Sequence, residues 1–249
     1  MRIIISPAKK MNVDVDSLPY NNIPYFLNET SLIMQTMQSL SDAELKKLWK
    51  CNDSIAKLNI QRLRTMNLQH NLTPAILSYE GIQYQYMAPS VFEYQHLDFI
   101  EKHLRILSGF YGVLKPFDGV VPYRLEMQAK LQIGAYKNLY QFWNKKLAKN
   151  IMEESNFILN LASKEYSKAV TAHLKSDVEL LTCSFAELKN GKITEKGTLC
   201  KMARGQMVRW LAENNVTKPN DIKYFNDLGY KFSNEYSTPC NYIFIKGEN

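Results

Sequence analysis

Hydrophobic residues along this chain occur in two alternating patterns, short continuous runs and a spacing of three to four positions. The continuous runs predict buried strands and lie at residues 2–5, 157–161, 178–185 and 242–245. The wider spacing predicts amphipathic helices over residues 29–40, 138–152 and 198–214. Strands that alternate with helices in this way predict an α/β fold, a mixed sheet with flanking helices.

Short polar signals mark where several elements begin or turn. Ser41-Asp42-Ala43-Glu44 is a capping box and predicts the start of a helix, and a further helix restarts near Asp53. Asn190-Gly191 is the strongest hairpin signal of the chain, so an antiparallel strand should follow from Lys192. Because no linker, low-complexity tract or internal repeat is visible, we expect residues 1–249 to form a single domain.

The stretch around Gly109 and Gly112 combines two flexible backbone positions with apolar residues on both sides. We interpret residues 98–116 as a helix-hairpin-helix, whose turn presents backbone N–H groups to phosphate without reading bases. Arg105 and Lys115 bracket the turn and add positive charge. An ordinary structural turn in apolar surroundings is the alternative interpretation.

Polar residues follow two of the predicted strands and recur on one later helix. Ser6-Pro7-Ala8-Lys9 comes directly after the first strand and is typical of a helix or turn start with free amide donors. Ligands of α/β folds gather at the carboxyl ends of strands, where the candidates here are Asn160, Ser163 and Glu165. Lys201, Arg204 and Gly205 share one face of the predicted helix at 198–214 and offer a further phosphate contact.

Arg124 and Glu126 lie two apart in a segment that we expect to be extended, so their side chains face the same side. If the polar residues converge, Glu126 is the candidate general base, and Lys9 and Arg204 are candidate anion clamps. Glu165 and Ser6 are the further catalytic candidates. The alternative is a purely structural role, in which Arg124 and Glu126 form a buried ion pair.

The charge of the chain favours an anionic partner. Its 249 residues carry a formal net charge of +7, with a sequence pI of about 9.0. The four cysteines and four histidines are scattered, without C-x-x-C or H-E-x-x-H spacing, so we expect no metal and no cofactor. No apolar run reaches the roughly 18 residues of a membrane span, and the N-terminal apolar segment is too short for a secretory signal. We therefore expect no membrane partner and a cytoplasmic location.

Several of these segments together resemble the YaaA family of bacterial peroxide-stress proteins. The resemblance covers nearly the whole chain and rests on Ile3 with Ser6 to Lys9, Leu107 to Gly109, Tyr111 to Leu114, Pro122 to Met127, Asn160 to Ser163, Glu165-Tyr166 and Ala203 to Gly205. Two positions depart from the family pattern. The chain has Tyr79-Glu80-Gly81 in place of Phe-Lys-Gly, and Lys201-Met202 in place of two lysines, and both changes remove positive charge.

The resemblance implies a DNA-binding protein with an α/β fold, a positively charged cleft and a helix-hairpin-helix. It also implies a link to hydrogen peroxide tolerance and to lower free intracellular iron, and it attaches no firm catalytic activity. Direct iron sequestration is disfavoured by the sequence, because no cluster of His, Cys or carboxylate residues is visible.

Our leading expectation is sequence-independent binding of DNA, damaged or non-duplex forms included, by a protein that we expect to be monomeric. The candidate DNA-binding residues are Lys9, Arg105, Gly109, Gly112, Lys115, Arg124, Asn160, Ser163, Lys201 and Arg204. The alternative is an enzyme that acts on a small anionic or nucleoside-like substrate in a pocket at the strand ends. Its catalytic candidates are Glu126, Glu165 and Ser6.

Overall fold

A mixed eight-stranded sheet runs through the molecule in the computed structural model, which describes residues 1–189 and 191–247. The strand order is β11-β12-β9-β8-β1-β5-β6, and β10 pairs with β9 beside this path. Neighbours from β12 to β5 run parallel, whereas β11, β6 and β10 pair antiparallel. The strands are β1 (Arg2–Ile5), β5 (Leu104–Ser108), β6 (Gly112–Leu114), β8 (Phe157–Asn160), β9 (Glu179–Lys189), β10 (Lys192–Thr194), β11 (Tyr230–Thr238) and β12 (Asn241–Lys246).

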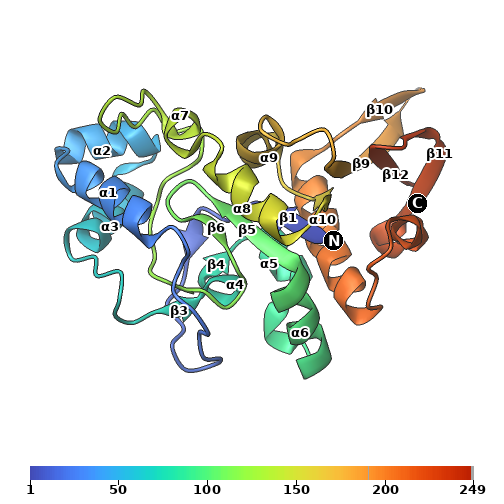
Figure 1. The fold of residues 1–249 in the computed structure, drawn as a ribbon, viewed down its shortest axis with the longest axis horizontal. Coiled ribbons are helices and arrows are strands. Elements are labelled where there is room, and N and C mark those ends of the chain that lie inside the picture. Colours follow the sequence, from blue (N-terminus) through green and yellow to red (C-terminus); the bar gives the residue numbers. More distant parts are fainter. Residues whose placement is uncertain (190, 248–249) are drawn as a thin grey trace.

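Helices cover both faces of this sheet, and the α/β fold predicted from the sequence is confirmed. Figure 1 shows α8 and α9 on one side of β1 and β5, α6 and α10 on the other, and α1 to α3 together at one end. The helices are α1 (Leu27–Gln38), α2 (Asp42–Trp49), α3 (Asp53–Arg64), α4 (Ala75–Ser78), α5 (Ile82–Met87), α6 (Tyr94–His103), α7 (Leu139–Trp143), α8 (Lys146–Glu154), α9 (Lys164–Thr171) and α10 (Gly197–Glu213). Short 3-10 helices lie at Pro89–Val91, Pro219–Tyr224 and Asp227–Gly229.

Two small ladders connect the loops beside the main sheet. β2 (Lys10–Met11) pairs with β4 (Tyr79–Glu80), and β3 (Thr73–Pro74) pairs with β7 (Gly119–Val120). Of the helix or turn start expected at Ser6-Pro7, the helix does not form, because the chain continues from β1 through an irregular segment with a bend at Lys9 into β2. Pairing of β2 with β4 supplies the backbone hydrogen bonds that a helix would otherwise have made.

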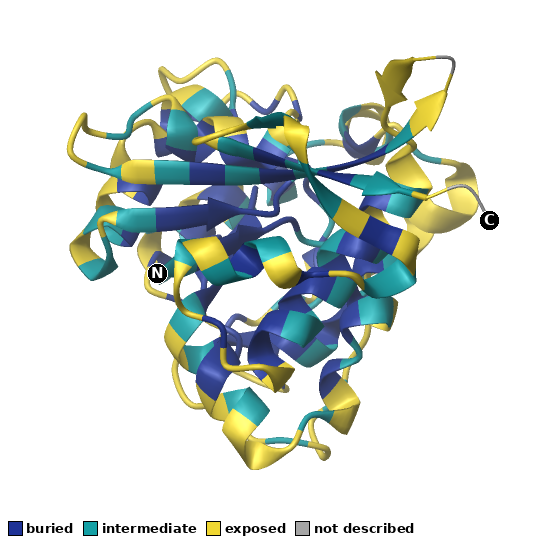
Figure 2. Ribbon diagram, turned by 90° about the vertical axis from the view of Figure 1, so that its right-hand side faces the viewer, coloured by how far each residue is buried: buried dark blue, intermediate teal, exposed yellow. Residues whose placement is uncertain are grey.

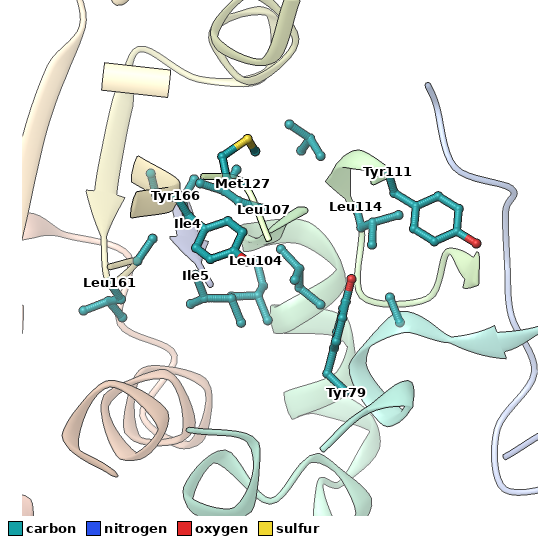
Figure 3. Packing of buried hydrophobic residues seen from close by; sticks show 14 of the residues in the cluster. Ile4, Ile5, Tyr79, Leu104, Leu107, Tyr111, Leu114, Met127, Leu161 and Tyr166 are labelled. Atoms are coloured by element: carbon teal, nitrogen blue, oxygen red, sulfur yellow. The ribbon is translucent and has the colours of Figure 1, made fainter. Parts of the chain in front are cut away.

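The core lies between the central strands and the helices on both faces. Ile3, Ile4 and Ile5 of β1 are all fully buried, as expected for a parallel strand covered on both sides. Figure 3 shows Ile4 and Ile5 packed among Leu104, Leu107, Leu161 and Tyr166. Buried positions continue along the central strands in Figure 2, while the outer faces of the helices are exposed.

Local signals in the sequence located most of the element starts. Ser41 begins α2 with both hydrogen bonds of a capping box to Glu44, and Asn52 caps α3. The helix predicted over 138–152 is two helices, because Asn144 adopts a positive φ of 43° between α7 and α8. The β9–β10 hairpin is confirmed by the pairing of Lys189 with Lys192, although Asn190 of its turn lies outside the described residues.

The expected helix-hairpin-helix at 98–116 is wrong, because the structure forms a β-hairpin there. The helix α6 ends at His103, and the chain continues as β5, a tight turn and β6. The Ser108 hydroxyl oxygen accepts hydrogen bonds from the N–H groups of Phe110 and Tyr111, at 3.1 and 2.9 Å. These turn amides are therefore satisfied inside the protein, and the whole turn is buried in the core.

Candidate functional site

A cavity of about 400 Å³ opens at the carboxyl ends of β1 and β8. β1 and β8 are adjacent in the sheet, but the strands that follow them lie on opposite sides, β5 beside β1 and β9 beside β8. The boundary between β1 and β8 is therefore a topological switch point. Ligands of open α/β sheets bind at such points because the diverging loops leave a crevice. The cavity gathers seven of the residues predicted from the sequence, which are Ser6, Lys9, Glu126, Ser163, Glu165, Lys201 and Arg204.

Two serines hold the loops after β1 and β8 together at the floor of this cavity. The backbone N–H of Ser163 donates to the hydroxyl oxygen of Ser6 at 2.8 Å, and the Ser6 hydroxyl donates to Ser163 Oγ at 3.2 Å. The Tyr84 hydroxyl also donates to the Ser6 carbonyl, at 3.1 Å. Both serine side chains are therefore engaged in positioning the loops, and no histidine lines the cavity to activate either as a nucleophile.

Glu126 reaches the cavity from the extended segment that follows β7. Its Oε1 atom lies 3.2 Å from Lys9 Nζ and 3.3 Å from Arg124 Nη2, and the side chains of Arg124 and Glu126 are each 11% exposed. The ion pair between Arg124 and Glu126, the alternative structural role expected from the sequence, is therefore present. Because the Glu126 carboxylate also lines the cavity, its ion pair with Arg124 holds this carboxylate where a ligand would lie.

Glu165 enters the cavity from the first turn of α9. Burial raises the pKa of this carboxyl group, and the nearby charge of Glu126 raises it further, whereas the Gln128 N–H and Lys9 act in the opposite direction. Its Oε1 atom accepts a hydrogen bond from Gln128 N at 3.3 Å. Glu165 therefore keeps its proton to a higher pH than an exposed glutamate does, directly beside a carboxylate that contacts two cations.

Two buried donors in the wall of the cavity have no acceptor among the described residues. They are Gln83 Nε2, on a side chain that is almost fully buried, and Arg204 Nε. Gln83 lines the candidate site and was missed by sequence reasoning, because an isolated glutamine in a short helix carries no signal. A Cβ on Gly205 would lie only 2.0 Å from the Gln83 carbonyl oxygen, so Gly205 allows α10 to approach α5 closely. Leaving buried donors unpaired costs about 1–3 kcal/mol each, so an acceptor from a ligand suits this wall.

The remaining predicted residues lie outside the cavity. Arg105 is buried, and its guanidinium donates to Glu154 at 2.8 and 3.0 Å, near the amino ends of the strands. Lys115 is exposed at that same opposite end of the sheet, close to Asp118. Gly109 and Gly112 are buried in the β-hairpin. We therefore place these four residues outside the candidate binding surface.

Asn160 has a structural role, because both polar atoms of its side-chain amide are hydrogen-bonded within the protein. Its side-chain nitrogen donates to Thr182 Oγ1 at 3.2 Å, and its side-chain oxygen accepts from Ala162 N at 3.0 Å. These bonds shape the turn that brings Ser163 to the cavity. Arg124 contacts the cavity only through Glu126.

Neither a metal-binding cluster nor a membrane-spanning helix is found in residues 1–189 and 191–247. No group of three or more His, Cys, Asp or Glu side chains in this part of the chain is placed to hold a metal ion. None of its helices combines the length and the apolar character needed to cross a membrane.

Comparison with known proteins places the chain among bacterial relatives along its entire length. The sequence profile described as "Peroxide stress protein YaaA" matches residues 1–236. A UPF0246 protein of Agathobacter rectalis is 52% identical over 244 residues, which is 98% of each chain. A UPF0246 protein of Lachnoclostridium phytofermentans is 51% identical over 249 residues, which is 100% of this chain and 98% of the relative.

Proposed function

This chain belongs to the peroxide stress protein YaaA family, and on that premise we propose that it binds DNA at the switch-point cavity during hydrogen peroxide stress. The proposed contact surface is this cavity and not the turn at Gly109 and Gly112, which the sequence suggested. Lowering of free intracellular iron is the expected cellular outcome, to be measured in cells with and without the protein.

The observation that carries the proposal is the set of donors that face this one cavity. Lys201 and Arg204 line it without an ion-pair partner among the described residues, and buried N–H groups of Gln83 and Arg204 have no acceptor there. Lys9 and Lys10 also line it, paired with Glu126 at 3.2 Å and with Glu80 at 2.6 Å. Phosphate oxygens are acceptors that combine negative charge with several lone pairs, so they satisfy both features at once. The formal net charge of +7 adds long-range attraction for a polyanion.

The size of the cavity favours DNA that is not fully paired. About 400 Å³ lies within the usual range for small-molecule pockets and accommodates roughly one nucleotide, not a duplex. A nucleotide reaches such a pocket from a single strand, a frayed end or a damaged site, where unstacking costs least. We therefore propose non-duplex or damaged DNA as the preferred form.

Titration of a fluorescent single-stranded oligonucleotide at increasing salt concentration tests this proposal. Two cation–phosphate contacts, from Lys201 and Arg204, predict a log–log slope near −1.4 for a single strand, and about four contacts, if phosphate also displaces the partners of Lys9 and Lys10, predict a slope near −3. Lys201→Ala should weaken binding to all sequences equally and should reduce the magnitude of the slope by about 0.7. Lys115→Ala is the matched control, because this exposed lysine lies at the opposite end of the sheet.

Two results would count against this function. Affinity that does not change with salt would mean that no phosphate is neutralised. An equal loss of affinity in Lys115→Ala and Lys201→Ala would place the contact surface elsewhere on the protein.

A second candidate function is an enzyme that acts on a small anionic or nucleoside-like substrate. The observation that favours it is the pair of carboxyl groups, Glu126 and Glu165, on one wall of the same cavity. Calorimetric titration with nucleoside 5′-monophosphates separates the two candidates. Saturable binding of a mononucleotide that displaces the oligonucleotide would support a small-molecule site, and its absence would leave DNA as the ligand.

A further inference from the structure

We propose that the cavity hydrolyses the N-glycosidic bond of the nucleotide it holds, with Glu165 as general acid and Glu126 as general base. The inference rests on the proposed function, because it takes a nucleotide as the occupant. It goes beyond binding by assigning a reaction to the carboxyl groups.

Two carboxyl groups in this one cavity, Glu126 and Glu165, have unequal environments. Glu126 is held at 3.2 and 3.3 Å from two cations, whereas Glu165 has no ion pair within 4 Å among the described residues and accepts a hydrogen bond from Gln128 N at 3.3 Å. Burial and the charge of Glu126 raise the pKa of Glu165. Two carboxyl groups in unequal environments are the arrangement with which enzymes cleave bonds at an anomeric carbon.

The other groups around the cavity suit the phosphate, sugar and base of a nucleotide. Lys201 and Arg204 of α10 supply positive charge on one wall for the phosphate group. Buried side chains of Tyr84 and Tyr166 supply surfaces that suit a base and a sugar ring. The unpaired Gln83 amide suits the edge of a base, where carbonyl and ring nitrogen acceptors lie.

The described residues that line the cavity include no activated nucleophile. The Ser6 hydroxyl is bonded to Ser163, and no histidine lines the cavity. Burial raises the pKa values of the Cys183 and Cys200 thiols, which disfavours their thiolate forms, and neither residue is among those that line the cavity. Acid–base catalysis by the carboxyl groups is the chemistry that these side chains support.

The proposed step balances without an oxidant or a further reactant. Glu126 accepts a proton from water while the water oxygen forms a bond to C1′ of the sugar. The bond from C1′ to the base nitrogen breaks, its electron pair stays with the base, and Glu165 donates a proton to that base. The products are the free base and a sugar with a hydroxyl group at C1′, and proton exchange with solvent restores both carboxyl groups.

Release of free base is the direct test. The probes are a single-stranded oligonucleotide and its duplex, each treated with hydrogen peroxide, and the nucleoside 5′-monophosphates. Free base is measured by mass spectrometry against a protein-free control, and abasic sites are measured by alkaline cleavage. Wild type should release base, and the rate should fall as the pH rises and Glu165 loses its proton.

Variants assign the chemistry to the named residues. Glu165→Gln keeps an acceptor for Gln128 N–H but has no acidic proton, so base release should fall about 100-fold or more while oligonucleotide affinity is kept. Glu126→Gln should also lower the rate. Glu153→Gln is the matched control and should keep the wild-type rate, since this exposed carboxylate lies at the opposite end of the sheet.

Each outcome has a defined meaning. Release from oligonucleotides only, or from mononucleotides only, supports the reaction and identifies the source of the nucleotide. Normal binding without base release from any probe overturns the proposed reaction and leaves the proposed binding function intact. Base release that persists in Glu165→Gln also overturns the proposed reaction without affecting the binding function. A wild-type protein that binds none of the probes overturns both proposals.

Discussion

Replacing Asp118 with asparagine should make the protein more stable at alkaline pH, because this carboxyl group is buried where its charge is poorly solvated. Asp118 is 3% exposed, and its Oδ2 atom accepts a hydrogen bond from Lys115 N at 2.8 Å. Burial raises the pKa of Asp118 to about 7, and the charge of Glu101 adds to this effect. The Lys115 N–H and the charges of Lys115 and Arg105 oppose it.

The magnitude follows from the difference between the folded and the unfolded pKa. An unfolded aspartate has a pKa near 3.9, so a folded value of about 7 corresponds to roughly 3 pKa units, or about 4 kcal/mol at most. Because the folded pKa is the higher one, the folded state binds the proton more tightly. The contribution of Asp118 to stability is therefore complete below about pH 4 and is lost as the pH rises through about 7.

Urea unfolding of wild type and Asp118→Asn across this pH range measures the effect. The asparagine oxygen still accepts from Lys115 N–H, and its NH₂ group replaces the protonated oxygen. The two proteins should have similar free energies of unfolding near pH 4, and the variant should be more stable by up to about 4 kcal/mol near pH 8. A difference between the two proteins that stays constant with pH would show that Asp118 titrates normally and would refute the reasoning.

Two further variants test the packing that builds the site. Glu154→Ala should lower the free energy of unfolding by about 3 kcal/mol in urea, because it leaves the guanidinium of Arg105 buried without its partner. An unchanged stability would mean that water replaces the carboxylate. Gly205→Ala should cost at least about 2 kcal/mol and weaken oligonucleotide binding, since the new Cβ would lie 2.0 Å from the Gln83 carbonyl oxygen. Gly197→Ala, where a Cβ meets nothing within 4 Å, is its control and should keep oligonucleotide binding and cause no loss of stability, because alanine is the better helix former at this first residue of α10.

The order and type of most elements could be predicted from the sequence, because they depend on local physics. Residues 2–5 are apolar throughout and form a central parallel strand, and the capping box at Ser41 supplies two hydrogen bonds within four residues. Polar residues directly after β1 and β8 indicated a site at the strand ends. Those ends are adjacent in the structure, which gathers Ser6, Ser163 and Glu165 in one cavity.

Other features depended on which distant segments become neighbours. The apolar spacing at 104–107 suits a buried helix end and a buried strand equally, and only pairing with β1 and β6 makes it a strand. Arg105 and Arg204 look alike in the sequence, but Glu154 engages the first, whereas the second lines the cavity. Gln83 became a site residue only because Gly205 lets α10 pack closely on α5. Hydrophobic periodicity records whether a side chain is buried, whereas the partners it meets there are set by the packing of segments far apart in the chain.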